Sequence, residues 1–345
     1  MTYLKKVVVI LCLFASTIAF TQDPQFTQFY ANSLHLNPAL AGKDLSPRFH
    51  SGYRNQWPEI KNAYVTYNLE YDDFIEKIHG GLGFQFLHDK TANGVLNTNL
   101  LSISYAYHLQ ISKGWSSSFS LKGAFQQKSF NTSLAQFGDQ IDEIRGFVYS
   151  TNQTINNPTS SYFDAGAGFL FFSSEYATFL PNSFAGVAVH HINRPQEAFI
   201  VNGSQNNKLP VRYTLHAGKQ ITVLKNGLFN KPLYISPNLL FDLQSNFKQF
   251  NFGAYFVDGI VGIGLWYRHT NFLNPTSDVF KLQDALVIMA GIENTKMRIG
   301  YSYDLNLSNL IGSSAGSHEL SITFDLPKKE ISKSDKYRVI HCPLF

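Results

Sequence analysis

The chain has 345 residues and a formal net charge of +4, with 15% charged residues, 15% aromatic residues and 24 glycines. So few charges beside so many aromatic rings argue against a helical soluble enzyme, in which about a quarter of the residues are charged. The basic residues are scattered as far as the C-terminal tail, which argues against a nucleic-acid-binding stripe. The length suits two average domains or one large all-β domain.

Residues 1–21 have the pattern of a secretory signal peptide, because two lysines precede an apolar run, residues 7–20, that ends in small and polar residues. The run is shorter than the roughly 20 apolar residues of a membrane-spanning helix. We expect cleavage between Ala19 and Gln22. Cys342 is then a lone cysteine, which can form no internal disulfide. Such an exported chain is periplasmic, extracellular or a β-barrel in an outer membrane.

Residues 22–46 form a segment rich in Gln, Asn and aromatic residues, and they lead directly into the first strand pattern. We expect this segment to lie at the periplasmic mouth of the sheet that follows, as a plug or as a partner-facing surface. The residues expected to pack into or under the sheet, or to face a partner, are Phe26, Phe29, Tyr30, Leu34, Leu36, Asn37 and Pro38.

Residues 47–326 alternate between apolar and polar side chains with a period of two. From residue 101 to residue 109, Leu, Ile, Tyr, Tyr and Leu alternate with Ser, Ser, Ala and His. In a strand these two sets face opposite sides of the sheet. The pattern predicts 14 strands, near residues 47–56, 61–72, 79–88, 95–110, 114–128, 162–172, 182–190, 209–224, 231–244, 246–257, 259–269, 284–293, 296–306 and 317–326.

These strands predict a single antiparallel transmembrane β-barrel, since outer-membrane barrels have an even number of strands and no sheet edge. If the first strand rises from the periplasm, the long connections lie outside the cell, as is typical of such barrels. These long connections are residues 129–161, 191–208, 270–283 and 307–316. A soluble sandwich would also alternate and remains the alternative fold.

By parity, the polar face of the strands would line the barrel lumen with charges of both signs. A strongly selective pore gathers one sign at a constriction, so mixed signs favour a plugged or narrow lumen. A general diffusion channel with a wet lumen remains the alternative. The lumen residues predicted in this way are Arg54, Glu70, Lys122, Asp164, Arg212, His216, Arg268, Arg298, Asp304, Glu319 and Asp325.

Signals of catalysis or metal binding are weak in this chain. It contains no Gly-x-Ser-x-Gly, His-Glu-x-x-His or Walker-type motif. His190 and His191 are adjacent on a predicted strand, so they point to opposite faces and cannot easily bind one metal ion together. We therefore expect no enzymatic activity and no cofactor. A barrel enzyme such as a lipase, using Ser102 and His216, is the remaining alternative.

Residues 327–345 form a lysine-rich tail beyond the last strand, on the periplasmic side by strand parity. Such a tail can be a solvated extension or a docking arm for a periplasmic partner. Its apolar end favours the docking arm. The residues expected to contact a partner or to contribute to a plug are Arg338, Cys342, Pro343 and Phe345.

Several motifs at the two ends of the mature chain resemble those of the PorP/SprF family of outer-membrane proteins of the type IX secretion system in Bacteroidetes. The motifs are QDPQFTQF at residues 22–29, NPALAG at 37–42, YRNQW at 53–57, YSYD at 301–304 and RVIHCPLF at 338–345. The resemblance spans the mature chain, and its middle part is loose.

The resemblance implies a non-enzymatic role in type IX secretion or gliding motility. Members link the outer membrane to periplasmic machinery, or assist export and surface attachment of a cargo adhesin. The implied partners are outer-membrane lipid, other secretion or gliding proteins and a secreted adhesin, with no nucleic acid. The alternative function is a porin-like diffusion channel.

Overall fold

The computed structural model describes residues 23–60, 63–142, 144–152, 158–197, 208–270, 284–307, 314–327 and 340. The expected signal peptide lies outside these residues. The same is true of four tail residues singled out above, Arg338, Cys342, Pro343 and Phe345.

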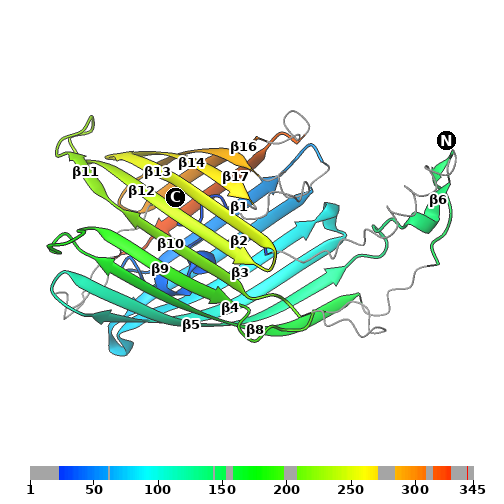
Figure 1. Cartoon of the computed structure of the whole chain (residues 1–345), viewed down its shortest axis with the longest axis horizontal. Helices are drawn as coiled ribbons and strands as arrows, with labels where there is room; N and C mark the ends of the chain where they lie inside the picture. The colour runs from blue at the N-terminus through cyan, green and yellow to red at the C-terminus, as the bar shows by residue number, and fades with distance from the viewer. Residues whose placement is uncertain are drawn as a thin grey trace.

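The described strands form one closed antiparallel barrel (Figure 1). Strand β1 pairs with β17 in one direction and with β2 in the other, and β10 pairs with both β9 and β12. The wall strands are β1 (Arg48–Gln56), β2 (Tyr64–Ile75), β3 (Gly80–Thr91), β4 (Leu96–Gln110), β5 (Trp115–Phe130), β8 (Thr159–Ser173), β9 (Ser183–His190), β10 (Arg212–Lys219), β11 (Ile221–Leu224), β12 (Leu233–Gln244), β13 (Phe247–Asp258), β14 (Val261–Thr270), β15 (Ala285–Glu293), β16 (Met297–Asn306) and β17 (Ser317–Asp325).

The described wall has 15 labelled strands, but β10 and β11 are one strand interrupted at Gln220. The predicted 14-stranded barrel is therefore confirmed. Every predicted strand overlaps an observed one. The prediction missed a small hairpin, β6 (Ile141–Asp142) and β7 (Gly146–Phe147), which projects from the connection after β5 (Figure 1). It was too short to give a periodic signal.

Helices are short in the described residues. They are α2 (Ser33–Leu36) and the 3-10 turns η1 (Pro38–Leu40), η2 (Glu76–Ile78), η3 (Ala92–Gly94) and η4 (Gly138–Gln140). Among the described residues, none of the helices has the length and apolar character needed to cross a membrane.

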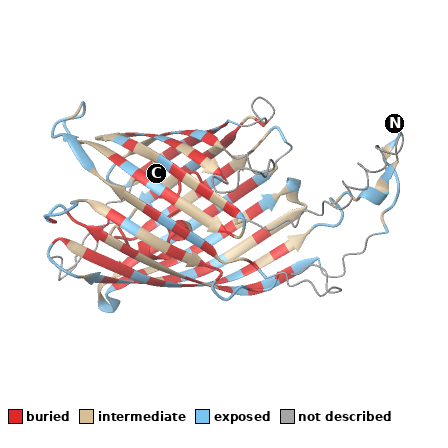
Figure 2. Ribbon diagram, in the orientation of Figure 1, coloured by how far each residue is buried: buried red, intermediate tan, exposed pale blue. Residues whose placement is uncertain are grey.

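Burial alternates along the strands as the sequence pattern predicts (Figure 2). On the outer face, Leu121 and Phe163 are 72% and 75% exposed, whereas Ser102 and Ser104 on the inner face are buried. An apolar outer band is what lipid requires of a barrel. Strand β15 is apolar on both faces because its inward residues, such as Met289, meet a second apolar layer inside the lumen.

The connections differ between the two ends of the barrel. Residues 131–158, 191–211, 271–284 and 307–316 join strands at one end, here called the long-connection end. Shorter hairpins, such as residues 111–114, 259–260 and 294–296, join them at the other, the short-connection end. β1 begins and β17 finishes at the short-connection end, because Arg48 pairs with Asp325.

Candidate functional site: a lumen filled by the N-terminal segment

Residues 23–46, here called the plug segment, lie inside the barrel lumen. Tyr30 and Leu40 are fully buried, although neither belongs to the barrel wall. The segment folds locally around Asn37, whose side chain accepts a 2.9 Å hydrogen bond from the Ala39 amide and caps η1. Pro38 occupies the first position of that turn, where its missing N–H costs nothing.

The plug segment runs along the lumen from end to end. Asp23 contacts Arg212 and Gln244, which lie at the long-connection end of β10 and β12. Asp44 contacts Arg298 near the start of β16, at the short-connection end. The segment expected as a plug or a partner-facing surface therefore lies inside the lumen as a plug, and it is not confined to one mouth of the barrel. Only its C-terminal part lies at the short-connection end, because buried wall charges hold the rest deep in the lumen.

One set of wall charges, here the Arg54 cluster, holds the first half of the plug segment. It consists of Arg54, Arg268, Asp304 and Glu319. Arg54 lies 2.9 Å from Asp304 and 3.2 Å from Glu319, and Arg268 lies 2.8 Å from Asp304. Thr27 enters this cluster, because its amide donates to Glu319 Oε2 at 2.6 Å and its hydroxyl donates to Asp304 Oδ2 at 2.8 Å.

The two arginines and two carboxylates of the Arg54 cluster balance in charge. Buried ions are tolerated when they are paired and their remaining hydrogen-bonding positions are filled. The plug segment fills some of these positions: besides Thr27, the Gln28 amide donates to Glu319 Oε1 at 3.2 Å. The plug segment therefore supplies donors that the carboxylates of this cluster would otherwise lack.

A second set of wall charges, here the Arg48 cluster, holds the second half. Arg48 Nε donates to Asp72 at 2.7 Å and Arg48 also pairs with Glu70 at 3.4 Å. The carboxylate of Glu70 accepts hydrogen bonds from the Leu34 and His35 amides at 3.1 and 3.2 Å. These are the free amides at the first turn of α2, where a carboxylate is favourable.

Sequence reasoning found Glu70 but missed Arg48 and Asp72. Both were detectable, since Arg48 has the parity of Arg54 on β1 and Asp72 has the parity of Glu70 on β2. Asp72 also accepts a 2.8 Å hydrogen bond from the Gly42 amide.

The other side of the plug segment packs on apolar side chains of the wall. Phe29 meets the Trp266 ring edge-on, with 4.7 Å between centroids, and Tyr30 meets Phe184 in the same way at 5.6 Å. Ile340 belongs to this apolar cluster and its amide donates to the Lys43 carbonyl at 3.1 Å. The C-terminal tail thus returns to the plug segment at this residue.

Two wall glycines allow the plug segment to approach the wall backbone closely. A Cβ on Gly81 would overlap the backbone carbonyl of Ala41. A Cβ on Gly168 would overlap the side chain of Asn37. These glycines are therefore needed for space, where any larger residue would displace the plug segment.

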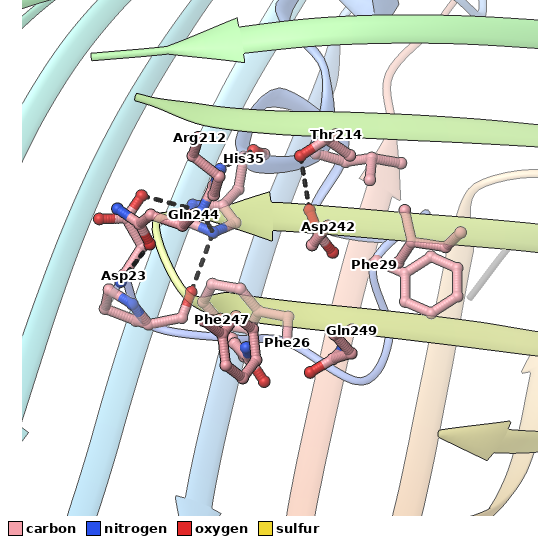
Figure 3. A pocket seen from close by; sticks show the side chains of 14 residues that line it. Asp23, Phe26, Phe29, His35, Arg212, Thr214, Asp242, Gln244, Phe247 and Gln249 are labelled. Carbon is pink, nitrogen blue, oxygen red and sulfur yellow. Dashed lines mark hydrogen bonds and ion pairs between the residues drawn. The ribbon is translucent and has the colours of Figure 1, made fainter. Parts of the chain in front are cut away.

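At the long-connection end, Asp23 pairs with Arg212 (Figure 3). It also pairs with His191. His191 is 2.8 Å from Asp23 and 2.9 Å from Asp164. Although burial opposes protonation, these two carboxylates raise the pKa of His191 to about 9. Burial also opposes ionisation of Asp23, but His191 and Arg212 hold its pKa well below the ordinary value. The end of the plug segment is thus fixed by opposite charges.

The space left beside this contact is small. A cavity of about 40 Å³ lies between the plug segment and the wall, beside Phe26, Asp242 and Gln249 (Figure 3). One water molecule needs roughly 10–15 Å³ by this measure, so the cavity has room for a few waters. Gln244 Nε2 and Gln249 Oε1 have no partner among the described residues and can bind such waters.

The remaining predicted residues also lie in the lumen. Lys122 donates to Gln85 at 2.8 Å on the wall and makes no hydrogen bond to the plug segment among the described contacts. His216 lies 3.0 Å from the Asn37 amide, and Asp325 pairs with Arg298 at 2.5 Å. Leu34 and Leu36 are buried within the plug segment. Among the described residues, no group of three metal-binding side chains occurs.

Residues 18–324 match the model of a family described as type IX secretion system membrane protein PorP/SprF. No curated protein matches the chain. Among solved structures, the chain is similar to Omp33 of Acinetobacter baumannii, with 6% identity, 83% of this chain and 100% of that chain covered, and a TM-score of 0.43. It is similar to the Ralstonia pickettii toluene transporter TbuX, with 9% identity, 85% and 91% covered, and a TM-score of 0.44. A third is the CymD monoaromatic hydrocarbon channel, with 10% identity, 86% and 93% covered, and a TM-score of 0.47.

Proposed function

Because the chain belongs to the PorP/SprF family of type IX secretion system membrane proteins, we propose that it is a sealed, non-enzymatic outer-membrane component of that machinery. In this role it links the outer membrane to periplasmic secretion or gliding proteins, or assists export and surface attachment of a cargo adhesin. The barrel fold and the family both fit the outer membrane.

The filled lumen is the observation that carries this proposal. The plug segment is tied to the wall by two buried charge clusters and by aromatic packing, and the cavity beside it has space only for waters. A diffusion channel needs a continuous aqueous path wider than its solute. A sealed barrel is suited instead to presenting surfaces to other proteins at its two ends.

Planar-bilayer conductance tests the sealed lumen. The purified full-length protein is expected to show no large steady pore, whereas a variant lacking residues 23–44 is expected to conduct steadily. A variant lacking residues 144–149, in the projecting connection, serves as the control and is expected to remain closed. A large steady pore in the unaltered protein would instead favour the diffusion-channel alternative.

Secretion by cells tests the assignment to the machinery. The variant lacking residues 23–44 is expected to insert into the outer membrane, as judged by its heat-modifiable mobility, and to impair type IX cargo secretion. Wild-type secretion by an inserted variant of this kind would refute a role for the plug segment in the machinery.

The proposal also specifies which end of the plug segment faces outside the cell and which end faces the periplasm. With the long-connection end outside the cell, as these barrels are oriented, Asp23 lies at the outer mouth and Asp44 at the periplasmic mouth. An epitope placed immediately before Asp23 is then expected to bind antibody on intact cells. Binding only after the outer membrane is permeabilised would reverse this orientation.

A further inference from the structure

Strand β11 presents an open edge of the barrel wall among the described residues. β11 pairs with β12, but its other side has no partner strand. The pairing between β9 and β10 ends at Ser183 and Lys219. One further hydrogen bond follows, from the Gln220 amide to the Asn182 carbonyl at 2.9 Å. Beyond this point β11 still pairs with β12, whereas its other side has no described strand to pair with.

The chain that precedes β9 turns away from the open edge. Leu180 and Asn182 have φ angles of 49° and 52°, in the left-handed region where few non-glycine residues lie. Ser173 Oγ fixes this turn, because it accepts from the Ser183 amide at 2.9 Å and donates to the Leu180 carbonyl at 2.5 Å. This turn directs the chain before β9 away from β11, so one side of β11 has no partner among the strands that the structure describes.

The open edge is preformed for strand pairing. Backbone groups of alternate residues point to the same side of an antiparallel strand. Since the Gln220 amide points towards β9, Thr222 presents its N–H and C=O to the same, open side. The hairpin tip is fixed as well, because Asp258 accepts the Leu228 amide at 2.8 Å.

The surface around this edge is apolar with a basic margin. All four β11 residues are exposed (Figure 2). The hairpin projects at the tip labelled β11 in Figure 1. Leu228 is 92% exposed, and Phe179 on the adjoining turn is 71% exposed. Lys225 and Lys231 flank the hairpin and are also exposed. Such a surface complements an extended segment with apolar and acidic residues.

We propose that β11 is a docking edge for an extended segment of another protein, which adds to the barrel sheet as an antiparallel strand. The segment alternates apolar residues, which contact the β11 hairpin, with acidic residues, which pair with Lys225 and Lys231. This site rests on the proposed function, which places the short-connection end in the periplasm. Lipid is the poorer occupant, because hydrocarbon cannot satisfy open backbone groups.

Binding of a defined peptide tests the docking edge. The probe is a fluorescein-labelled peptide of eight alternating valines and glutamates, and the full chain is held in nanodiscs of zwitterionic lipid. Fluorescence anisotropy is expected to show saturable binding. A peptide N-methylated at alternate residues, which lacks the donors of one edge, is expected to bind at least about tenfold more weakly.

Two variants at Thr222 distinguish backbone pairing from nonspecific binding of the peptide. Thr222→Pro removes the open N–H and is expected to raise the Kd about tenfold, while Thr222→Val keeps the N–H and is expected to leave it unchanged. Proline is tolerated on an edge strand where its nitrogen faces solvent, so the hairpin is expected to fold. Lys225→Glu with Lys231→Glu is expected to weaken binding of the acidic peptide further.

The outcomes distinguish the alternatives. No binding, or equal binding by both Thr222 variants, would overturn the proposal. Binding only by a variant that stops at Pro327 would assign the edge to the chain's own tail. Recruitment of anionic vesicles without peptide binding would assign the surface to lipid. Each result is obtained with purified protein, so it is independent of whether the secretion role holds.

Discussion

The two arcs of the barrel wall hold the plug segment by different physical means. In the charged arc, β16, β17, β1 and β2, buried carboxylates such as Glu319 and Glu70 accept hydrogen bonds from plug amides. In the packing arc, β3, β8, β9 and β12–β15, contact is made by aromatic rings such as Trp266 and by glycines such as Gly81.

Polar contacts also occur outside the charged arc. Arg268 on β14 belongs to the Arg54 cluster. Arg212 on β10 pairs with Asp23, and Gln244 on β12 accepts a hydrogen bond from the Asp23 amide.

The two kinds of contact have different effects on the plug segment. A hydrogen bond to a buried carboxylate is directional, and a shift of the plug segment by one residue would remove amide donors from these buried carboxylates. Apolar packing tolerates small rearrangements when volume is preserved. The charged arc therefore fixes where the plug segment lies, and the packing arc provides the contact area that excludes water.

The largest effect is expected in the charged arc, from Arg54→Met. This change leaves Asp304 with Arg268 as its ion-pair partner and removes the arginine that pairs with the buried Glu319. Breaking a buried ion pair by removing one partner costs about 3–5 kcal/mol. Urea unfolding in detergent, followed by tryptophan fluorescence, is expected to show a loss of this size in the free energy of unfolding.

Lys90→Met is the control for this experiment, since Lys90 is exposed on β3. It removes a lysine from the surface and is expected to change the free energy of unfolding by less than about 0.5 kcal/mol. Equal effects from Arg54→Met and Lys90→Met would contradict the assignment of Arg54 to a charge cluster that holds the plug.

A smaller effect is expected in the packing arc, from Gly81→Ala. The added Cβ would meet the Ala41 carbonyl, a backbone atom that cannot rotate away. Overpacking of this kind costs about 1–3 kcal/mol. Limited proteolysis is expected to cut the plug segment faster in this variant than in the unaltered protein.

Gly123→Ala provides the matched comparison, because nothing lies within 4 Å of a Cβ at Gly123. Its proteolysis rate is expected to equal that of the unaltered protein. If Gly123→Ala and Gly81→Ala were cut at the same rate, close approach of the plug segment at Gly81 would be ruled out.

The barrel could be predicted from the sequence because its signal is local. Alternation over some ten residues predicts a strand, and parity then assigns most lumen residues, including Arg54, Glu319 and Asp304. The facing of β15 could not be assigned in this way, because Leu286 and Val287 are equally apolar. Its inward side is decided by the aromatic layer of the plug segment, which lies far away in the sequence.

The depth of the plug segment could not be predicted, because it is set by contacts distant in the sequence. Thr27 and Glu319 are 292 residues apart and yet share a hydrogen bond. No periodic pattern in residues 22–46 encodes such a partner. The same holds for the β11 edge, which is open only because β9 turns away at Asn182.

The smallest effect concerns the contact between Asp23 and His191, where the plug segment reaches the long-connection end. The pKa of His191 in the folded protein is about 9, above its ordinary value of 6.5. The stabilisation from its charge is therefore fully present below pH 6.5 and is lost as the pH rises through about 9. Hydrogen exchange of residues 23–29, corrected for the intrinsic pH dependence of exchange, is expected to accelerate between pH 7 and pH 10. His191→Asn removes the titrating group and is expected to abolish this acceleration, whereas residues 38–44, distant from His191, are expected to exchange at a corrected rate that does not change. Acceleration of equal size in both parts of the plug segment would show that the whole segment loosens, which would contradict a local charge contact at Asp23.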